Sequence, residues 1–142
     1  MAVPSHSRLV TALGGVLLAL GAAVAIVPRF TECSSPTAMC RSTARWEIVV
    51  GAAIAVLAVL VIVTPRRVRQ AAALGAAALA VLSILLPTSI TGVCSDPMMH
   101  CRKYLEPTSI LLGVVALVVS LVVFGLVTLS GKRPAGPERF AE

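Results

Sequence analysis

Charged residues are scarce in this sequence, and their scarcity limits the kind of fold that it can form. Only 13% of the 142 residues are charged, whereas ordinary soluble domains have about 25%. The hydrophobic fraction is 58% and the mean hydropathy is +0.97. A soluble fold of this size leaves much of its surface in water and could not bury so many apolar side chains. The composition therefore predicts a single integral membrane domain over residues 1–142.

Ionisable residues are almost absent from the apolar part of the chain, and this absence argues against transport or conduction by the chain alone. Four apolar runs, each long enough to span a bilayer as a helix, cover residues 9–27, 46–64, 71–86 and 108–129. Glu47 is their one ionisable residue, and we expect it to face water or a neighbouring helix. Ser83, Ser120 and Thr128 are expected to hydrogen-bond within their own helices.

Small residues are frequent in the same runs and predict how the helices pack. Glycine and alanine allow close approach of membrane helices, so we expect the bundle to pack through glycine and alanine faces. The third run, 71–86, is rich in alanine, which predicts a helix packed against others. Formation of a homo-oligomer through this run is a further hypothesis.

The usual catalytic motifs are also missing. The sequence has no glycine-rich phosphate loop, no Ser-His-Asp set and no paired carboxylates. The net charge of +6 does not predict nucleic-acid binding, because the basic residues lie at the ends of apolar runs without interleaved aromatics. No cofactor is predicted, and an enzymatic activity would have to depend on the cysteines alone.

A cysteine motif is present twice and organises the chain. CSSPTAMCR at 33–41 recurs as CSDPMMHCR at 94–102, and the two segments contain all four cysteines. Each lies between two apolar runs, in loops predicted over 28–45 and 87–107, and a basic turn is predicted over 65–70. The sequence therefore predicts an all-α protein of four transmembrane helices with an internal two-fold repeat of helix, cysteine loop and helix. Repeat one is 8–64, repeat two is 71–130, and a polar tail follows at 131–142.

The distribution of Lys and Arg predicts how the chain lies in the plasma membrane. Seven basic residues flank the side that carries the termini and the 65–70 turn, against five in the cysteine loops. By the positive-inside rule, both termini are predicted to be cytoplasmic and the cysteine loops extracytoplasmic. The first run, preceded by Arg8 and ending in small residues, also fits a cleaved signal peptide. The matching repeat favours a retained helix.

The four cysteines are expected to form disulfides, because disulfides persist outside the cytosol. Three pairings are possible. We favour bridges within each loop, Cys33–Cys40 and Cys94–Cys101, since each repeat carries its own pair. A bridge between the loops, such as Cys33–Cys94, remains open.

Three functional interpretations compete. In the first, the disulfides stiffen the outer loops of a non-catalytic bundle. In the second, the protein is a membrane thiol-disulfide oxidoreductase, although such enzymes usually have Cys-x-x-Cys, which is missing here. In the third, the protein handles Cu(I), for which soft sulfur ligands are suited. The candidate ligands beside the cysteines are Met39, Met98, Met99 and His100.

Three further residues are candidates for contact with a partner or with lipid. Arg41 and Arg102 follow the second cysteine of each motif and could contact anionic headgroups or a protein; the alternative is a basic side chain that extends to the membrane interface. Trp46 lies where a helix is expected to meet the headgroups, a common position for tryptophan.

The residues around the cysteines resemble those of the uncharacterised bacterial domain-of-unknown-function family 4418. The resemblance rests on MCRSTARWEI at 39–48, LPTSITGVC at 86–94, CR at 101–102 and LEP at 105–107. It extends over about residues 8–130 and implies a small four-helix membrane protein with two related cysteine loops. Arg41 stands where the family often has histidine, which weakens a metal role there.

The resemblance carries no established activity. Proteins of this kind look like companions of ABC-type permeases of the lipoprotein-release or macrolide-export type. The resemblance therefore implies an accessory or interaction subunit in the membrane. A membrane-protein partner and the lipid bilayer are the expected surroundings.

Overall fold

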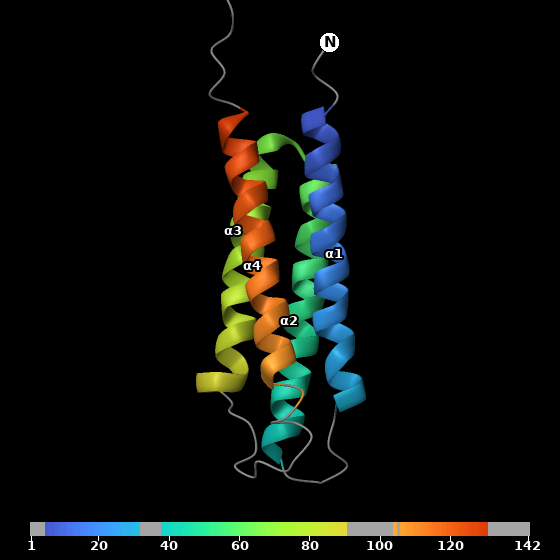
Figure 1. The fold of residues 1–142 in the computed structure, drawn as a ribbon, viewed down its shortest axis with the longest axis vertical. Coiled ribbons are helices and arrows are strands. Elements are labelled where there is room, and N and C mark those ends of the chain that lie inside the picture. Colours follow the sequence, from blue (N-terminus) through green and yellow to red (C-terminus); the bar gives the residue numbers. More distant parts are fainter. Residues whose placement is uncertain (1–4, 32–37, 91–103, 105, 131–142) are drawn as a thin grey trace, which may run out of the picture.

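The computed structural model describes residues 5–31, 38–90, 104 and 106–130. Its elements are α1 (Ser5–Thr31), α2 (Ala38–Val63), α3 (Arg66–Leu85), the short π-helix η1 (Leu86–Ile90) and α4 (Glu106–Leu129). Every element in these ranges is helical, which confirms the predicted all-α class. The helices run alternately up and down in one elongated bundle (Figure 1).

The two ends of the bundle differ in what they contain. At one end, which we call the terminal end, α1 begins, α4 ends, and α2 connects to α3 (Figure 1). At the other end, α1 and η1 end while α2 and α4 begin (Figure 1). We call this the cysteine end, because the segments that follow α1 and η1 in the sequence carry the cysteine motifs. The beginning of α2 projects past the neighbouring helix ends there (Figure 1).

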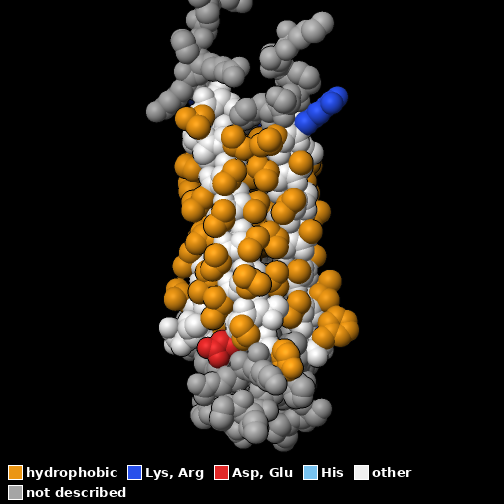
Figure 2. All heavy atoms as spheres, in the orientation of Figure 1, with side chains coloured by type: hydrophobic (Ala, Val, Ile, Leu, Met, Phe, Trp, Pro, Cys, Tyr) orange, Lys and Arg blue, Asp and Glu red, His pale blue; other side chains and the backbone are white. Residues whose placement is uncertain are grey.

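Four helical segments are long and apolar enough to cross a membrane. They are Arg8–Phe30, Ser42–Val63, Arg66–Ser89 and Glu106–Leu129, with mean hydropathies of 2.4, 2.7, 2.0 and 3.1. Hydrophobic side chains cover the visible side of the bundle over most of its height (Figure 2). In water such a surface would be costly, whereas in a bilayer it is solvated by acyl chains. The protein is therefore a multi-pass membrane protein in a lipid bilayer.

Glycine brings α1 and α2 into backbone contact. A Cβ atom built on Gly21 would lie 2.7 Å from the backbone nitrogen of Ala55, and one on Gly51 would lie 2.5 Å from that of Ala25. No side chain fits at either position without moving a backbone, so only glycine permits this spacing. The expectation that glycine faces pack in the bundle is confirmed.

Alanine has the same role on α3. The buried residues of this helix are Ala72, Ala73, Ala76, Ala77, Ala80 and Ser83. They contribute to two buried clusters that draw on α1, α2, α3 and α4 together. The prediction of a helix packed against others is confirmed, and its alanine face lies inside the bundle. The exposed positions of α3 are mostly larger, among them Leu74, Val81 and Leu85.

The helices extend into segments that we predicted as loops. Residues 65–70 are not a turn, because α3 begins at Arg66 with Pro65 as its N-cap residue. Proline fixes φ near the helical value, and arginine and glutamine favour helix, so the first turn of α3 forms directly after it. Similarly, α2 begins at Ala38, and α1 continues through Pro28 to Thr31. Pro28 cannot donate a backbone hydrogen bond to the carbonyl four residues before it, and α1 nevertheless continues for three residues beyond it.

Candidate functional site

A buried carboxyl group lies between α2 and α4 near the cysteine end. Ser109 of α4 donates a hydrogen bond from its Oγ to Oε2 of Glu47 on α2, at 2.8 Å. Glu47 is 1% exposed and Ser109 is 3% exposed. Oε1 of Glu47 has no hydrogen-bond partner among the described residues. Of our two alternatives for Glu47, water or a neighbouring helix, the structure selects the neighbouring helix.

Other polar and proline side chains are buried at the same end. Thr43, one helical turn before Glu47, is fully buried, as are Pro28 of α1 and Pro87 of η1. Ser83 on α3 is also fully buried. It lies in the turn of α3 that packs on α4, since a Cβ atom on Gly113 would be 3.2 Å from the carbonyl oxygen of Ala80. The membrane-embedded core is thus most polar near the cysteine end.

The predictions for the three hydroxyl groups in the apolar runs have different outcomes. Ser120 donates to the carbonyl oxygen of Ala116 at 2.7 Å, and Thr128 donates to that of Phe124 at 3.0 Å. Both predictions of bonding within the helix are confirmed. For Ser83 the prediction is wrong, because its Oγ has no hydrogen-bond partner among the described residues.

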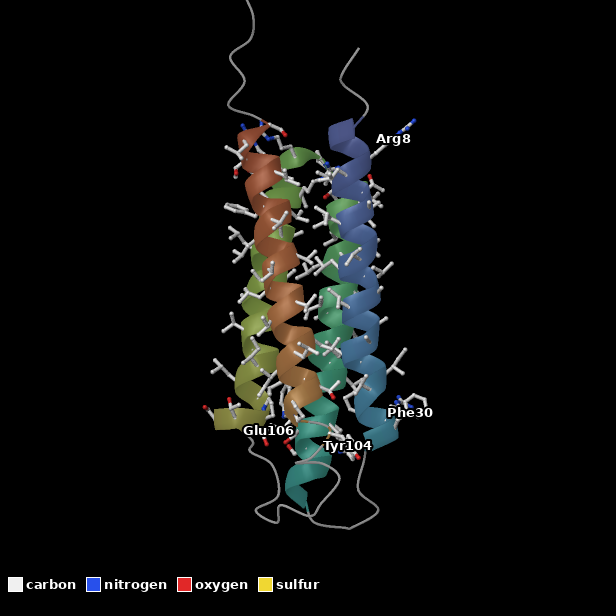
Figure 3. All side chains as sticks on the ribbon, in the orientation of Figure 1. Arg8, Phe30, Tyr104 and Glu106 are labelled. Carbon is white, nitrogen blue, oxygen red and sulfur yellow. The ribbon has the colours of Figure 1, made fainter. Side chains whose placement is uncertain are left out.

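Exposed aromatic side chains gather at the cysteine end. Phe30 at the end of α1 is 84% exposed, Trp46 on α2 is 55% exposed, and Tyr104, just before α4, is 48% exposed. Phe30 and Tyr104 lie at the same end of the bundle, opposite Arg8 (Figure 3). The other described aromatic residue, Phe124, is only half-buried and lies on α4 toward the terminal end. The three exposed rings come from three separate segments.

Charged side chains of both signs accompany these rings. Arg29 precedes Phe30 and Arg45 precedes Trp46, and both arginines are exposed. Glu106 opens α4, where a negative charge interacts favourably with the helix dipole. Within the described residues, no group of three or more His, Cys, Asp or Glu side chains is placed to hold a metal ion. What these residues offer chemically is hydrogen bonding, cation–π contact and burial of aromatic surface.

The residues predicted as sites from the sequence fall mostly outside the described part of the chain. Those outside it altogether are Cys33, Cys94, Cys101, Arg102, Met98, Met99 and His100. Met39, Cys40 and Arg41 lie in the first turn of α2, but their side chains are outside the described part. Trp46 is described and is exposed, in the part of α2 nearer the cysteine end.

Sequence reasoning missed Ser109, Phe30 and Tyr104 as members of this end of the bundle. A signal for Ser109 was present, because the buried residues of α4 include the small series Ser109, Gly113, Ala116 and Ser120 at helical spacing. That series identifies the face of α4 that packs inward. Phe30 and Tyr104 gave no such signal, since a single aromatic residue beside a loop has no periodicity.

One family of known proteins matches most of the chain. The model of the family described as "Domain of unknown function (DUF4418)" matches residues 15–126 of the 142. Neither a search of curated proteins nor a search of solved structures found a significant match. The match includes most of each of the four spans and both cysteine motifs. The chain belongs to the DUF4418 family.

Proposed function

We propose that this protein is a non-catalytic accessory or interaction subunit of a plasma-membrane assembly, and that it binds its partner at the cysteine end. The observation that carries the proposal is the group of exposed aromatic residues there, Phe30, Trp46 and Tyr104. Aromatic residues and arginine are enriched at the centre of protein interfaces. Rings that only anchored the bundle in lipid would be expected at both membrane interfaces.

The proposed orientation places the cysteine end outside the cell and both termini in the cytoplasm. The arginines at the two ends support it. Among the arginines whose side chains the structure describes, Arg8, Arg66, Arg67 and Arg69 lie at the terminal end, and only Arg29 and Arg45 lie at the cysteine end. In this orientation the cysteines face an oxidising compartment.

We further propose that each cysteine loop contains its own disulfide, Cys33–Cys40 and Cys94–Cys101. Only residues 32–37 separate α1 from α2, and Cys40 lies in the first turn of α2, so a Cys33–Cys40 bridge would connect the segment after α1 to the start of α2. A small closed loop of this kind would hold the neighbouring aromatic residues in a fixed arrangement. That rigidity lowers the entropy cost of binding a partner.

The proposed internal repeat is supported by equivalent contacts in the two helix pairs. A Cβ atom on Gly51 would lie 2.8 Å from the carbonyl oxygen of Gly21, and one on Gly113 would lie 3.2 Å from that of Ala80. The second helices of the two pairs correspond with an offset of 62 residues, as Gly51 and Gly113 show. The first helices correspond with an offset of 59 residues, which separates Gly21 from Ala80 and also separates the buried Pro28 from the buried Pro87. On this proposal Ser109 is the equivalent of Glu47, from which it is also 62 residues distant.

The proposed partner is another membrane protein, with an ABC-type permease as the specific candidate that the family resemblance implies. Site-specific photocrosslinking in the native membrane tests this. A photoreactive residue would replace Trp46 or Phe30 in the full-length protein, and Val118, exposed on the apolar side of α4, would be the matched control. We expect adducts with one permease subunit from positions 46 and 30. Crosslinks to lipid alone from both positions would overturn the proposal.

The state of the cysteines provides the second test. Thiols would be alkylated in protein purified without air, and the mass would be read before and after graded reduction. The proposal expects four oxidised cysteines that resist mild reductants. A pair that equilibrates at a mild potential would favour the thiol-disulfide oxidoreductase instead. Four reduced cysteines protected by copper would favour copper handling.

A further inference from the structure

The terminal end of the bundle carries positive charge that no described acidic residue balances. Arg8 lies at this end on α1, and Arg66, Arg67 and Arg69 lie on the first turn of α3 (Figures 1 and 3). The described acidic residues lie toward the cysteine end, Glu47 in the first half of α2 and Glu106 at the start of α4. We call Arg8, Arg66, Arg67 and Arg69 the terminal arginine group.

Two members of this group are already engaged by backbone carbonyls. Arg66 donates from Nε to the carbonyl oxygen of Val127 and from Nη2 to that of Thr128, both at 3.1 Å. Arg69 donates from Nη2 to the carbonyl oxygen of Thr64 at 3.1 Å. These bonds hold the two guanidinium groups in place and satisfy carbonyls at the ends of α4 and α2. They do not neutralise the positive charges, because a carbonyl oxygen carries only a partial charge.

The other two members make no such contact. Arg8 and Arg67 are exposed, and neither guanidinium group has a hydrogen bond or ion pair with a described residue. Both lie at the boundary of a membrane-spanning segment, since the first span begins at Arg8 and the third at Arg66. At the end of such a segment a helix leaves the hydrocarbon core and enters the headgroup region of a bilayer. A guanidinium group binds phosphate in a bidentate manner and stays charged at every relevant pH.

Apolar side chains beside these arginines fit the rest of a lipid molecule. Leu9 follows Arg8 and Val68 follows Arg67, and both are exposed, as is Val63 at the end of α2. A phosphate bound at either arginine would therefore lie close to exposed apolar side chains of the adjoining membrane-spanning segment. A phospholipid uses both features, whereas free phosphate uses only the first.

We propose that the terminal arginine group binds the headgroup phosphates of anionic phospholipids in the adjacent leaflet. Arg8 and Arg67 contact the phosphates directly, and Arg66 and Arg69 add charge from fixed positions. This surface is at the end of the molecule opposite the proposed protein-binding site. The inference therefore stands independently of the proposed function.

Native mass spectrometry of the full-length protein in mild detergent tests the inference. The protein would be titrated with phosphatidylglycerol or phosphatidylcholine, and the retained lipid counted. The variant is R8Q/R67Q, and its matched control is R29Q/R45Q, which removes two exposed arginines from the cysteine end. We expect wild type and control to retain phosphatidylglycerol in preference to phosphatidylcholine. We expect the R8Q/R67Q variant to bind it more weakly, by about fivefold for each charge removed.

Three results would overturn the inference. Equal losses from the two double variants would mean that lipid retention follows net charge and not the terminal end. Equal retention of the two lipids by wild type would mean that the arginines do not select anionic headgroups. Protection from thermal unfolding by millimolar inorganic phosphate, equal to that by phosphatidylglycerol, would identify a free anion as the ligand. The R8K/R67K variant keeps both charges, and it is expected to bind phosphatidylglycerol more tightly than R8Q/R67Q but more weakly than wild type, because lysine lacks the bidentate geometry of arginine.

Discussion

Ser109 and Glu47 meet inside the membrane-spanning bundle through a hydrogen bond of 2.8 Å, although they are 62 residues apart. The bond connects α2 with α4, and therefore connects the α1–α2 pair with the α3–α4 pair. The bond matters for stability because the carboxyl group is buried. Neither water nor lipid is positioned to donate a hydrogen bond to it in place of the serine hydroxyl. Loss of the serine would leave both carboxyl oxygens without a described partner.

Replacement of Ser109 by alanine is expected to destabilise the bundle. An interhelical hydrogen bond in a membrane protein contributes about 1 kcal/mol and at most about 2 kcal/mol, and we expect S109A to lose an amount in this range. Unfolding in mixed detergent micelles, followed by circular dichroism, measures it. The matched control is S120A, which removes a buried hydroxyl that bonds only to its own helix at 2.7 Å. Equal destabilisation by the two variants would contradict a special role for the bond to Glu47.

Addition of a methyl group at Gly51 is expected to separate α1 from α2. The new Cβ atom would lie 2.5 Å from the backbone nitrogen of Ala25, and a backbone cannot move aside as a flexible side chain can. Overpacking of this kind costs about 1 to 3 kcal/mol, so G51A should unfold at a lower detergent denaturant fraction than wild type. Gly15 provides the control, since a Cβ atom there meets nothing within 4 Å. A G15A variant as unstable as G51A would refute this explanation.

Arg66 and Arg67 are adjacent in the sequence but are expected to differ in their effect on stability. Arg66 satisfies the carbonyls of Val127 and Thr128 at the end of α4, and hydrogen bonds to charged groups contribute about 1.5 to 3 kcal/mol. We expect R66A to lower the thermal stability and R67A to leave it almost unchanged in detergent without added lipid. Thermal unfolding of the two variants in the same detergent measures the difference. A larger loss from R67A would contradict the assignment.

The proposed disulfide pairing can be tested by double-mutant cycles on the cysteines. If Cys33 pairs with Cys40, then C33A, C40A and the double variant should lose the same stability, about 2 to 3 kcal/mol for a small loop. C33A and C94A should instead be additive, because they would break different bridges. Thermal unfolding with and without reductant provides the values. Coupling between positions 33 and 94 would favour a bridge between the two loops.

The sequence by itself determined the class of the fold and the close packing of its helices through small residues. Four apolar runs, nearly without ionisable residues, require helices in a bilayer because every backbone polar group must be satisfied internally. Their glycine and alanine content required close packing, which Gly21, Gly51 and the alanines of α3 provide. The family could also be recognised from the sequence, because its motifs are short and each consists of consecutive residues.

Only the tertiary structure decided which residues from different helices face one another. It placed Ser109 against Glu47, left the Ser83 hydroxyl without a described partner, and used Arg66 to bond the end of α4. It also assembled Phe30, Trp46 and Tyr104 at one end. The physical reason is that hydropathy depends on composition along the chain, whereas these contacts depend on how the helices rotate and slide against one another. Small residues set those rotations. Their spacing in the sequence identifies the face of a helix that packs inward, but it does not identify the helix against which that face packs.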